Sequence, residues 1–500
     1  MLPRGPLKRP RDRQAAPVEY VKVCPTYGPG FFYIPGTTTC LKVFGNARFE
    51  SNVSQRYRRS GDDNSSYRSG LQIGLDARDN TEYGLVRTVA RVDAMYRTGD
   101  AAGMGALRSG SARRSGLATT GDNGYGFMGN PNGAGAQDYI EVMGYVQVGG
   151  LTAGRLQSAY TFAGPAGGQA VGYMGVIGGD SPFMQNQIGY TLSAGNGVTA
   201  TVSIEDPTNR RMGIASVNTA GATDRTNTGA AVSADQYIAG VGYGANRVPD
   251  VVGNVTVAQS WGQLKVSGAY HEVISGAPDI GAKAGFAGQI GIKLAADMIA
   301  KGDAFYAQAG YSVGANSYLW NGLTSSQPGV AASQPTVNGT AVNATGNNGL
   351  GYGNVAATLA DGVVDQDRKL TLSKSMGVSA AFDHYWVPTV HSWVAGSYTA
   401  INWSSKVRNT EFLSGAAIGS TTATVANVDP AKHYMVSVGT EWNPIKGLAI
   451  GTEVSYAKLT LKDAAPGIGN GGVANASDPT AGDKKTQDIW GVRFRVKRDF

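Results

Sequence analysis

The 500-residue sequence lacks the long hydrophobic run that a transmembrane helix requires. No window approaches about 18 consecutive apolar residues, and long stretches with the 3.6-residue period of an amphipathic helix are also missing. Only 16% of the residues are charged, and the mean hydropathy is -0.18. These absences argue against a helical membrane protein, whereas a β-barrel can lie in lipid at such a mean hydropathy because its backbone hydrogen bonds are satisfied between strands.

The chain also lacks the motifs of common enzymes. Gly124–Gly129 matches the dinucleotide fingerprint and Gly310–Gly314 matches the hydrolase nucleophile elbow, but neither lies between a predicted strand and a predicted helix. There is no Walker loop, no HExxH sequence and no spacing of metal ligands around the four histidines. We therefore expect neither an enzyme, nor a cofactor, nor a metal site.

Outside its first residues, the chain has little excess of positive over negative charge. The net charge is +7, and the basic residues of segment 1–16 contribute most of it. A nucleic-acid partner is therefore not expected. Residues 1–16 have the charge of a signal-peptide start but no apolar region follows, so we expect an unstructured tail or a residual targeting segment.

Cysteine is limited to Cys24 and Cys40. In an oxidising compartment we expect them to pair, closing a loop that stabilises the fold by about 3 kcal/mol. The alternative is two free thiols.

Alternation between apolar and polar residues is the pattern that the chain has in abundance. In the last eleven residues Trp490, Val492, Phe494, Val496 and Phe500 share one parity, and Arg493, Arg495 and Lys497 share the other. A transmembrane β-strand, apolar toward lipid and polar toward a wet interior, explains both faces. The fold class predicted is an all-β, antiparallel transmembrane β-barrel.

Short turns and long loops alternate along the predicted barrel. The first three strands are expected near 41–49, 71–78 and 86–97, with short turns at Asn80–Thr81, Gly149–Gly150, Gly195–Gly197, Gly262–Gln263, Lys301–Gly302, Val387–Thr389 and Asn443–Ile445. Long polar loops are expected at 53–69, 98–136, 163–186, 207–249, 274–280, 314–370, 403–431 and 461–486. This alternation of short turns and long loops predicts about 16 strands. Eighteen strands remain an alternative if 236–243 or 354–363 are also strands.

Several segments carry a family resemblance. The segments are Val18–Cys24, Gly30–Thr37, Cys40–Val43, Ala200–Pro207, Pro249–Val252 through Ala258–Gly262, His384–Pro388 and the terminal Phe500. They resemble the alphaproteobacterial outer-membrane porins of the Brucella and Rhizobium type. The resemblance covers roughly residues 17–500, which we expect to form a single porin β-barrel domain, with the Cys24–Cys40 segment leading into the first strand. The chain departs from the family at residues 1–16, where the basic tail replaces a signal peptide.

The resemblance implies a passive diffusion channel for small hydrophilic solutes and ions in the outer membrane of a Gram-negative bacterium. It implies a homotrimer in contact with outer-membrane lipid and lipopolysaccharide, with the third long loop folded into the pore. It also implies that the strand ending at Phe500 is the recognition tag for the barrel assembly machinery.

The pore lining is predicted from strand parity. The inward residues expected on the wall are Lys42, Arg48, Arg78, Arg87, Arg91 and Arg155, and the third loop presents Asp180 opposite them. This arrangement favours weak anion selectivity, although each arginine could equally be a solvated lumen residue paired with a nearby acid. The closing strand places Arg493, Arg495 and Lys497 on the same basic wall as Lys42 and Arg48.

Two other functions fit the sequence. A substrate-specific channel would line its path with aromatic residues, for which Tyr139, Tyr145 and Tyr173 are candidates. A surface adhesion protein would use the barrel only as an anchor and loop 314–370 for binding.

Overall fold

The computed structural model describes residues 22–54, 65–98, 137–162, 184–211, 214–216, 243–276, 280–319, 336–337, 340–341, 360–364, 369–408, 412–414, 424–426, 430–461 and 486–500. Helical structure in these residues is limited to the short segments η1 (Pro25–Tyr27), η2 (Thr208–Arg210), η3 (Asn316–Tyr318) and α4 (Ser405–Arg408). None of the described helices has the length and apolar character needed to cross a membrane.

Sixteen strands form the wall of a barrel. They are β2 (Cys40–Ser54), β3 (Ser65–Thr81), β4 (Gly84–Thr98), β5 (Gln137–Val148), β6 (Leu151–Gln157), β7 (Met184–Gly195), β8 (Val198–Glu205), β10 (Asp250–Gln259), β11 (Gly262–Val273), β12 (Lys283–Ala295), β13 (Ala304–Val313), β18 (Lys374–Val387), β19 (Val390–Asn402), β22 (Ala431–Ile445), β23 (Leu448–Leu461) and β24 (Thr486–Asp499).

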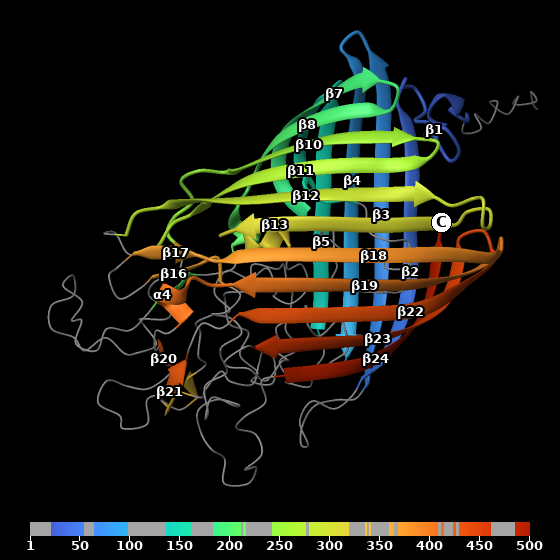
Figure 1. The fold of residues 1–500 in the computed structure, drawn as a ribbon. Helices are drawn as coiled ribbons and strands as arrows, with labels where there is room; N and C mark the ends of the chain where they lie inside the picture. The colour runs from blue at the N-terminus through green and yellow to red at the C-terminus, as the bar shows by residue number, and fades with distance from the viewer. Residues whose placement is uncertain are drawn as a thin grey trace, which may run out of the picture.

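Each wall strand pairs antiparallel with the next, and β24 pairs with β2 to close the ring (Figure 1). Phe500 continues this pairing, because its N–H donates to the Gly45 carbonyl at 2.9 Å. The predicted closure of the last strand against the first is thus confirmed, as is the count of 16. The barrel register aligns inward side chains from strands distant in sequence.

The remaining strands lie outside the wall. β1 (Phe32–Tyr33) pairs with the start of β2. β9 (Ile214–Ser216), β16 (Gly362–Val364) and β17 (Leu370–Leu372) form a separate three-stranded sheet, and two small hairpins are β14 (Thr336–Val337) with β15 (Thr340–Ala341) and β20 (Phe412–Ser414) with β21 (Thr424–Ala426). Of the two extra wall strands considered, 236–242 lies outside the described residues. The other candidate, 354–363, ends within β16, which does not join the barrel.

Four of the seven predicted short turns overlap the observed ones, and three are displaced to neighbouring residues. Asn80–Thr81 belongs to β3, so that turn lies at Glu82–Tyr83. Gly262 begins β11, so that turn lies at Ser260–Trp261, and Asn443–Ile445 belongs to β22, so that turn lies at Lys446–Gly447. The register between β22 and β23 shifts between Trp442 and Ile445. A strand irregularity accommodates Pro444, which has no N–H for the ladder.

Alternate side chains point out of the barrel and form an apolar belt. Val255, Ile290 and Val438 are 49%, 49% and 53% exposed and share this outer face. The inner face is mostly polar, and a ring of this many strands encloses an aqueous channel rather than a packed core. One apolar cluster inside the barrel forms where loop residues Tyr160 and Tyr318 lie on the wall.

Candidate functional site

The inner face of β24, β2, β3 and β4 is rich in basic side chains. Residues directly opposite in an antiparallel pair share one face, and Ile73 and Val92 (47% and 45% exposed) mark the outer one. The inward cations with described side chains are Lys42, Arg48, Arg68, Arg78, Arg87, Arg91, Arg493, Arg495 and Lys497. The inward acids of these strands are Glu50, Asp76, Asp93 and Asp499. We call this surface the arginine wall.

Most acids of the arginine wall are engaged by its cations. Arg68 binds Glu50 at 3.1 Å and Arg91 binds Asp93 at 2.8 Å. Arg495 reaches past β23 to β22 and binds Glu441 at 3.4 Å. Since the cations outnumber the acids, the wall keeps an excess of positive charge that pairing within it does not remove.

Arg155 lies on the opposite face from the one predicted. It stands across from Gly144 on β5 and Asn186 on β7, on the face that carries the exposed Val146 and Ile188. Its Nε donates to the Val142 carbonyl at 3.0 Å. The prediction that Arg155 lines the interior is therefore wrong. The seven-residue strand β6 has apolar residues of both parities, so its alternation did not fix its orientation.

The other predicted residue on the pore, Asp180, lies outside the described residues, as does most of its loop. The segment just before the predicted loop, 158–162, is described and lies inside the barrel. It packs on the inner face of β8, β10, β11 and β12, a surface we call the loop wall. The inward folding predicted for loop 163–186 concerns residues 163–183, which lie outside the described residues.

The loop wall holds the backbone of this segment with side chains. Lys265 Nζ donates to the Thr161 carbonyl at 2.8 Å, and Asn254 Nδ2 donates to the Ala159 carbonyl at 2.9 Å. The Phe162 ring lies over Gly291, where an added Cβ would overlap the ring. The inward residues that bond segment 158–162 are Glu205, Asn254, Lys265 and Gln289.

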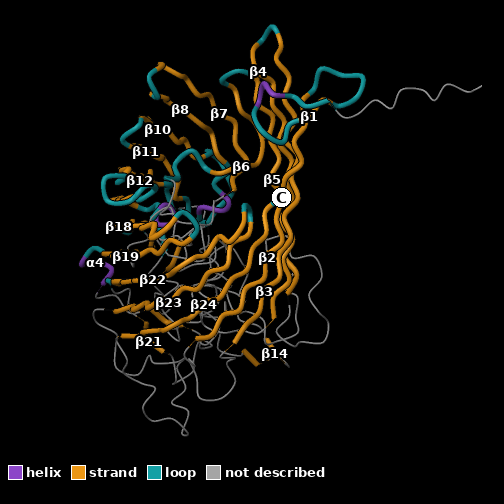
Figure 2. Tube along the Cα trace, turned by 90° about the vertical axis from the view of Figure 1, so that its right-hand side faces the viewer, coloured by secondary structure: helices purple, strands orange, loops and turns teal. Residues whose placement is uncertain are grey.

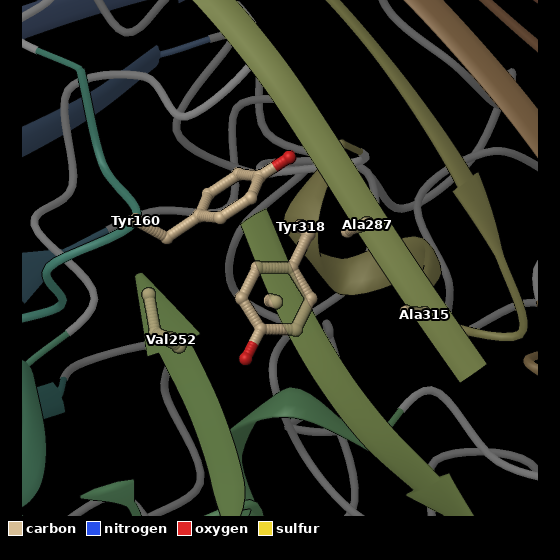
Figure 3. Packing of buried hydrophobic residues seen from close by; sticks show 6 residues of the cluster. Tyr160, Val252, Ala287, Ala315 and Tyr318 are labelled. Carbon is tan, nitrogen blue, oxygen red and sulfur yellow. The ribbon is translucent and has the colours of Figure 1, made fainter. Parts of the chain in front are cut away.

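Apolar contacts add to this anchoring. The rings of Tyr160 and Tyr318 meet edge to face with centroids 4.7 Å apart, over Val252 and Ala287 of the wall (Figure 3). Tyr318 belongs to η3, in the loop after β13. Two loops far apart in sequence therefore pack against each other inside the barrel.

A buried hydrogen-bond network fastens the loops further. His271 Nδ1 and Asp250 Oδ1 are 2.7 Å apart, and Tyr318 donates to Asp250 Oδ2 at 2.7 Å. Tyr243 donates to Asp361 Oδ2 at 2.5 Å and lies 3.1 Å from His271 Nε2. The network joins two wall strands to the loops after β8 and β13. Sequence reasoning missed this network, because Tyr243, Tyr318 and Asp361 lie in the predicted loops 207–249 and 314–370.

Both tyrosines of the network are held in the neutral form. Burial raises the pKa of Tyr243 and Tyr318 well above the usual value, and the carboxylates Asp361 and Asp250 raise it further. Nearby cations oppose this shift, since Arg210 lies 4.2 Å from the centroid of the Tyr318 ring. The tyrosines therefore remain hydrogen-bond donors at neutral pH.

The disulfide segment lies at the end of the barrel that carries the short turns. Cys24 and Cys40 are bonded, as expected, with Cα atoms 6.0 Å apart (Figures 1 and 2 show the β1 segment beside the barrel). They pack in a small core with Phe31, flanked by Tyr27 and Tyr33. The guanidinium of Arg78 lies 4.7 Å from the Phe31 ring centroid. The segment thus touches the arginine wall at its turn end.

Comparison with known proteins assigns this chain to a protein family. The family model described as the porin subfamily matches residues 12–492. The chain belongs to this family. It is accordingly a bacterial outer-membrane protein.

Relatives of this porin are known in Brucella. Porin Omp2b of Brucella abortus (strain 2308) is 30% identical over 267 residues, or 51% of this chain and 58% of that protein. Porin Omp2b of Brucella neotomae is 31% identical over the same length. The match thus spans little more than half the length of these curated relatives.

A solved structure shares the fold of this porin. The crystal structure of the outer membrane channel DcaP of Acinetobacter baumannii aligns with a TM-score of 0.52 at 12% sequence identity, covering 94% of this chain and 99% of that one. The short turns of such barrels face the periplasm and the long loops face the outside. The disulfide segment is therefore at the periplasmic end.

Proposed function

We propose that this porin forms a water-filled channel for passive diffusion of small hydrophilic solutes and ions, with a weak preference for anions. The observation that carries the proposal is the arginine wall, in which inward cations outnumber inward acids along four adjacent strands. Lys42, Arg48, Arg78, Arg87 and Arg91 line the channel in this proposal. Their charge attracts anions with a strength that falls as salt rises.

The channel is narrowed by the loop after β6. Anchoring of residues 158–162 on the loop wall supports this role, because it directs the chain that follows into the interior. The narrow passage then lies between the loop and the arginine wall. Asp180 is proposed to face the passage from the loop.

The partners are proposed from the family and from the outer surface. The exposed apolar belt supports contact with outer-membrane lipid and lipopolysaccharide. A homotrimer is the proposed assembly, and the strand that ends in Phe500 the proposed tag for the barrel assembly machinery. One domain is proposed for residues 17–500, with 1–16 as a tail outside it.

Reconstitution tests the channel directly. Liposomes containing the refolded protein should swell in isotonic solutions of small sugars, and a salt gradient should give a zero-current potential of the sign expected for anion preference. Absence of swelling would refute the diffusion channel and favour the adhesion alternative. A clear cation preference would refute the proposed role of the arginine wall but would leave the diffusion channel intact.

A further inference from the structure

Asp76 differs from the other acids of the arginine wall because it binds two guanidinium groups at once. Arg78 donates from Nε at 3.0 Å and from Nη2 at 2.7 Å. Arg87 donates from the same two positions at 3.0 Å and 2.9 Å. Glu50 and Asp93 each bind one arginine in the described part of the wall.

Charge around Asp76 is unbalanced. Lys42 stands directly across from Asp76 in the strand register, and no acid lies within ion-pair distance of its ammonium in the described part of the chain. Two guanidinium groups therefore bind one carboxylate, and a third cation, the Lys42 ammonium, belongs to the residue opposite it on β2. The nearest other acid on the strand, Asp79, is hydrogen-bonded by Thr39 Oγ1 at 2.9 Å.

Both arginines keep donors for a second anion. A guanidinium has five N–H groups, and each arginine spends two on Asp76. The Arg78 and Arg87 side chains are 23% and 28% exposed, whereas Asp76 is 7% exposed. The carboxylate is thus covered while the unused faces of its two partners remain open to the interior.

Aromatic rings fix the two guanidinium groups in place. Arg78 lies 5.6 Å from the centroid of the Tyr27 ring as well as against Phe31, and Arg87 lies 5.7 Å from the centroid of the Tyr145 ring. Tyr27 and Phe31 are held by the disulfide segment. A guanidinium group that is already oriented loses less conformational entropy when it binds an oxyanion.

We propose that Lys42, Arg78 and Arg87 form an oxyanion-binding site at the periplasmic mouth, which holds a carboxylate or phosphate group of a solute in transit. Asp76 serves as the spacer that aligns the two guanidinium groups. The site makes the channel retain oxyanionic solutes longer than chloride. This inference rests on the proposed channel function for its role, but the binding itself can be measured separately.

Single-channel recordings in potassium chloride test the site with inorganic phosphate and with acetate as probes. Either oxyanion should reduce the chloride current in a saturable way, and the more strongly blocking one identifies the solute class. Arg87→Gln should weaken the block about tenfold, the equivalent of one lost charge-assisted hydrogen bond. Arg87→Lys should weaken it as well, because lysine keeps the charge but not the planar fork.

Lys301→Gln is the matched control. It removes one positive charge from the exposed β12–β13 turn at the same end of the barrel, away from the site. The block should persist in this variant. Equal block in the wild type, Arg87→Gln and Lys301→Gln would overturn the site.

Calorimetric titration of phosphate into the detergent-solubilised protein separates this inference from the proposed function. The wild type could show no conductance and still release heat on binding phosphate, with that heat lost in Arg87→Gln. This outcome would refute the channel but not the site. Conductance without any saturable oxyanion binding would refute the site and leave the channel intact.

Discussion

The arginine wall and the loop wall occupy the same barrel and follow the same alternation, yet the basic cluster around Asp76 and the network around Asp250 have different surroundings. On the arginine wall the Arg78 and Arg87 side chains are 23% and 28% exposed. On the loop wall the His271 and Asp250 side chains are both 0% exposed, because loop residues cover them. An inward polar residue of such a barrel is therefore either part of the lining or part of a socket for a loop, and strand parity alone does not distinguish them.

The largest expected effect compares one acid from each wall. Asp250→Ala removes the partner of His271 and Tyr318 in a fully buried site, so we expect the free energy of unfolding to fall by about 3 to 5 kcal/mol. Asp76→Ala leaves two arginines that water can reach, and the loss should be much smaller. Denaturant unfolding of both variants in the same detergent measures the difference. Equal losses would mean that the two walls do not differ in the way described.

A lysine pair tests whether the loop wall positions the loop. Lys265→Met removes the donor to the buried Thr161 carbonyl, at a cost of about 1 to 3 kcal/mol, and should loosen residues 158–162. We expect a higher and noisier single-channel conductance. The control is Lys293→Met, on the same face of the adjacent strand, where the ammonium lies 5.3 Å from the Tyr306 ring centroid. Identical traces for the two variants would contradict the anchoring role.

Alkaline pH should weaken the loop wall. Burial raises the pKa of Tyr243 and Tyr318 above the usual tyrosine value of 10.0, so above that pH these tyrosines lose protons in the unfolded chain but keep them in the folded one. The folded state then binds more protons, and stability must fall as pH rises. Each tyrosine adds a slope of about 1.4 kcal/mol per pH unit. Unfolding measured from pH 9 upward should show a shallower decline for Tyr318→Phe, and an unchanged slope would refute the assignment.

The sequence predicted the arginine wall better than the loop wall for a physical reason. Strands with one apolar face, such as β24 and β4, report their orientation through alternation, so Arg87 and Arg91 could be placed inward. β6 has no such face, and Arg155 was placed wrongly. The network of Tyr243, Tyr318 and Asp361 depends on loop contacts across more than a hundred residues, which no local pattern encodes. The disulfide was predictable because only two cysteines were available to pair.

The smallest expected effect concerns ion selectivity and uses two positions of opposite parity. Arg48 faces inward across from Lys497, whereas Arg498 faces outward and donates to the Lys446 carbonyl. Arg48→Gln should reduce the anion preference slightly, and more at low salt than at high salt, because mobile ions screen the remaining charges within about 10 Å at 0.1 M. Arg498→Gln removes the same charge from the outer face and should leave the zero-current potential unchanged. A shift of equal size in both variants would mean that net charge of the whole protein, and not the arginine wall, sets the selectivity.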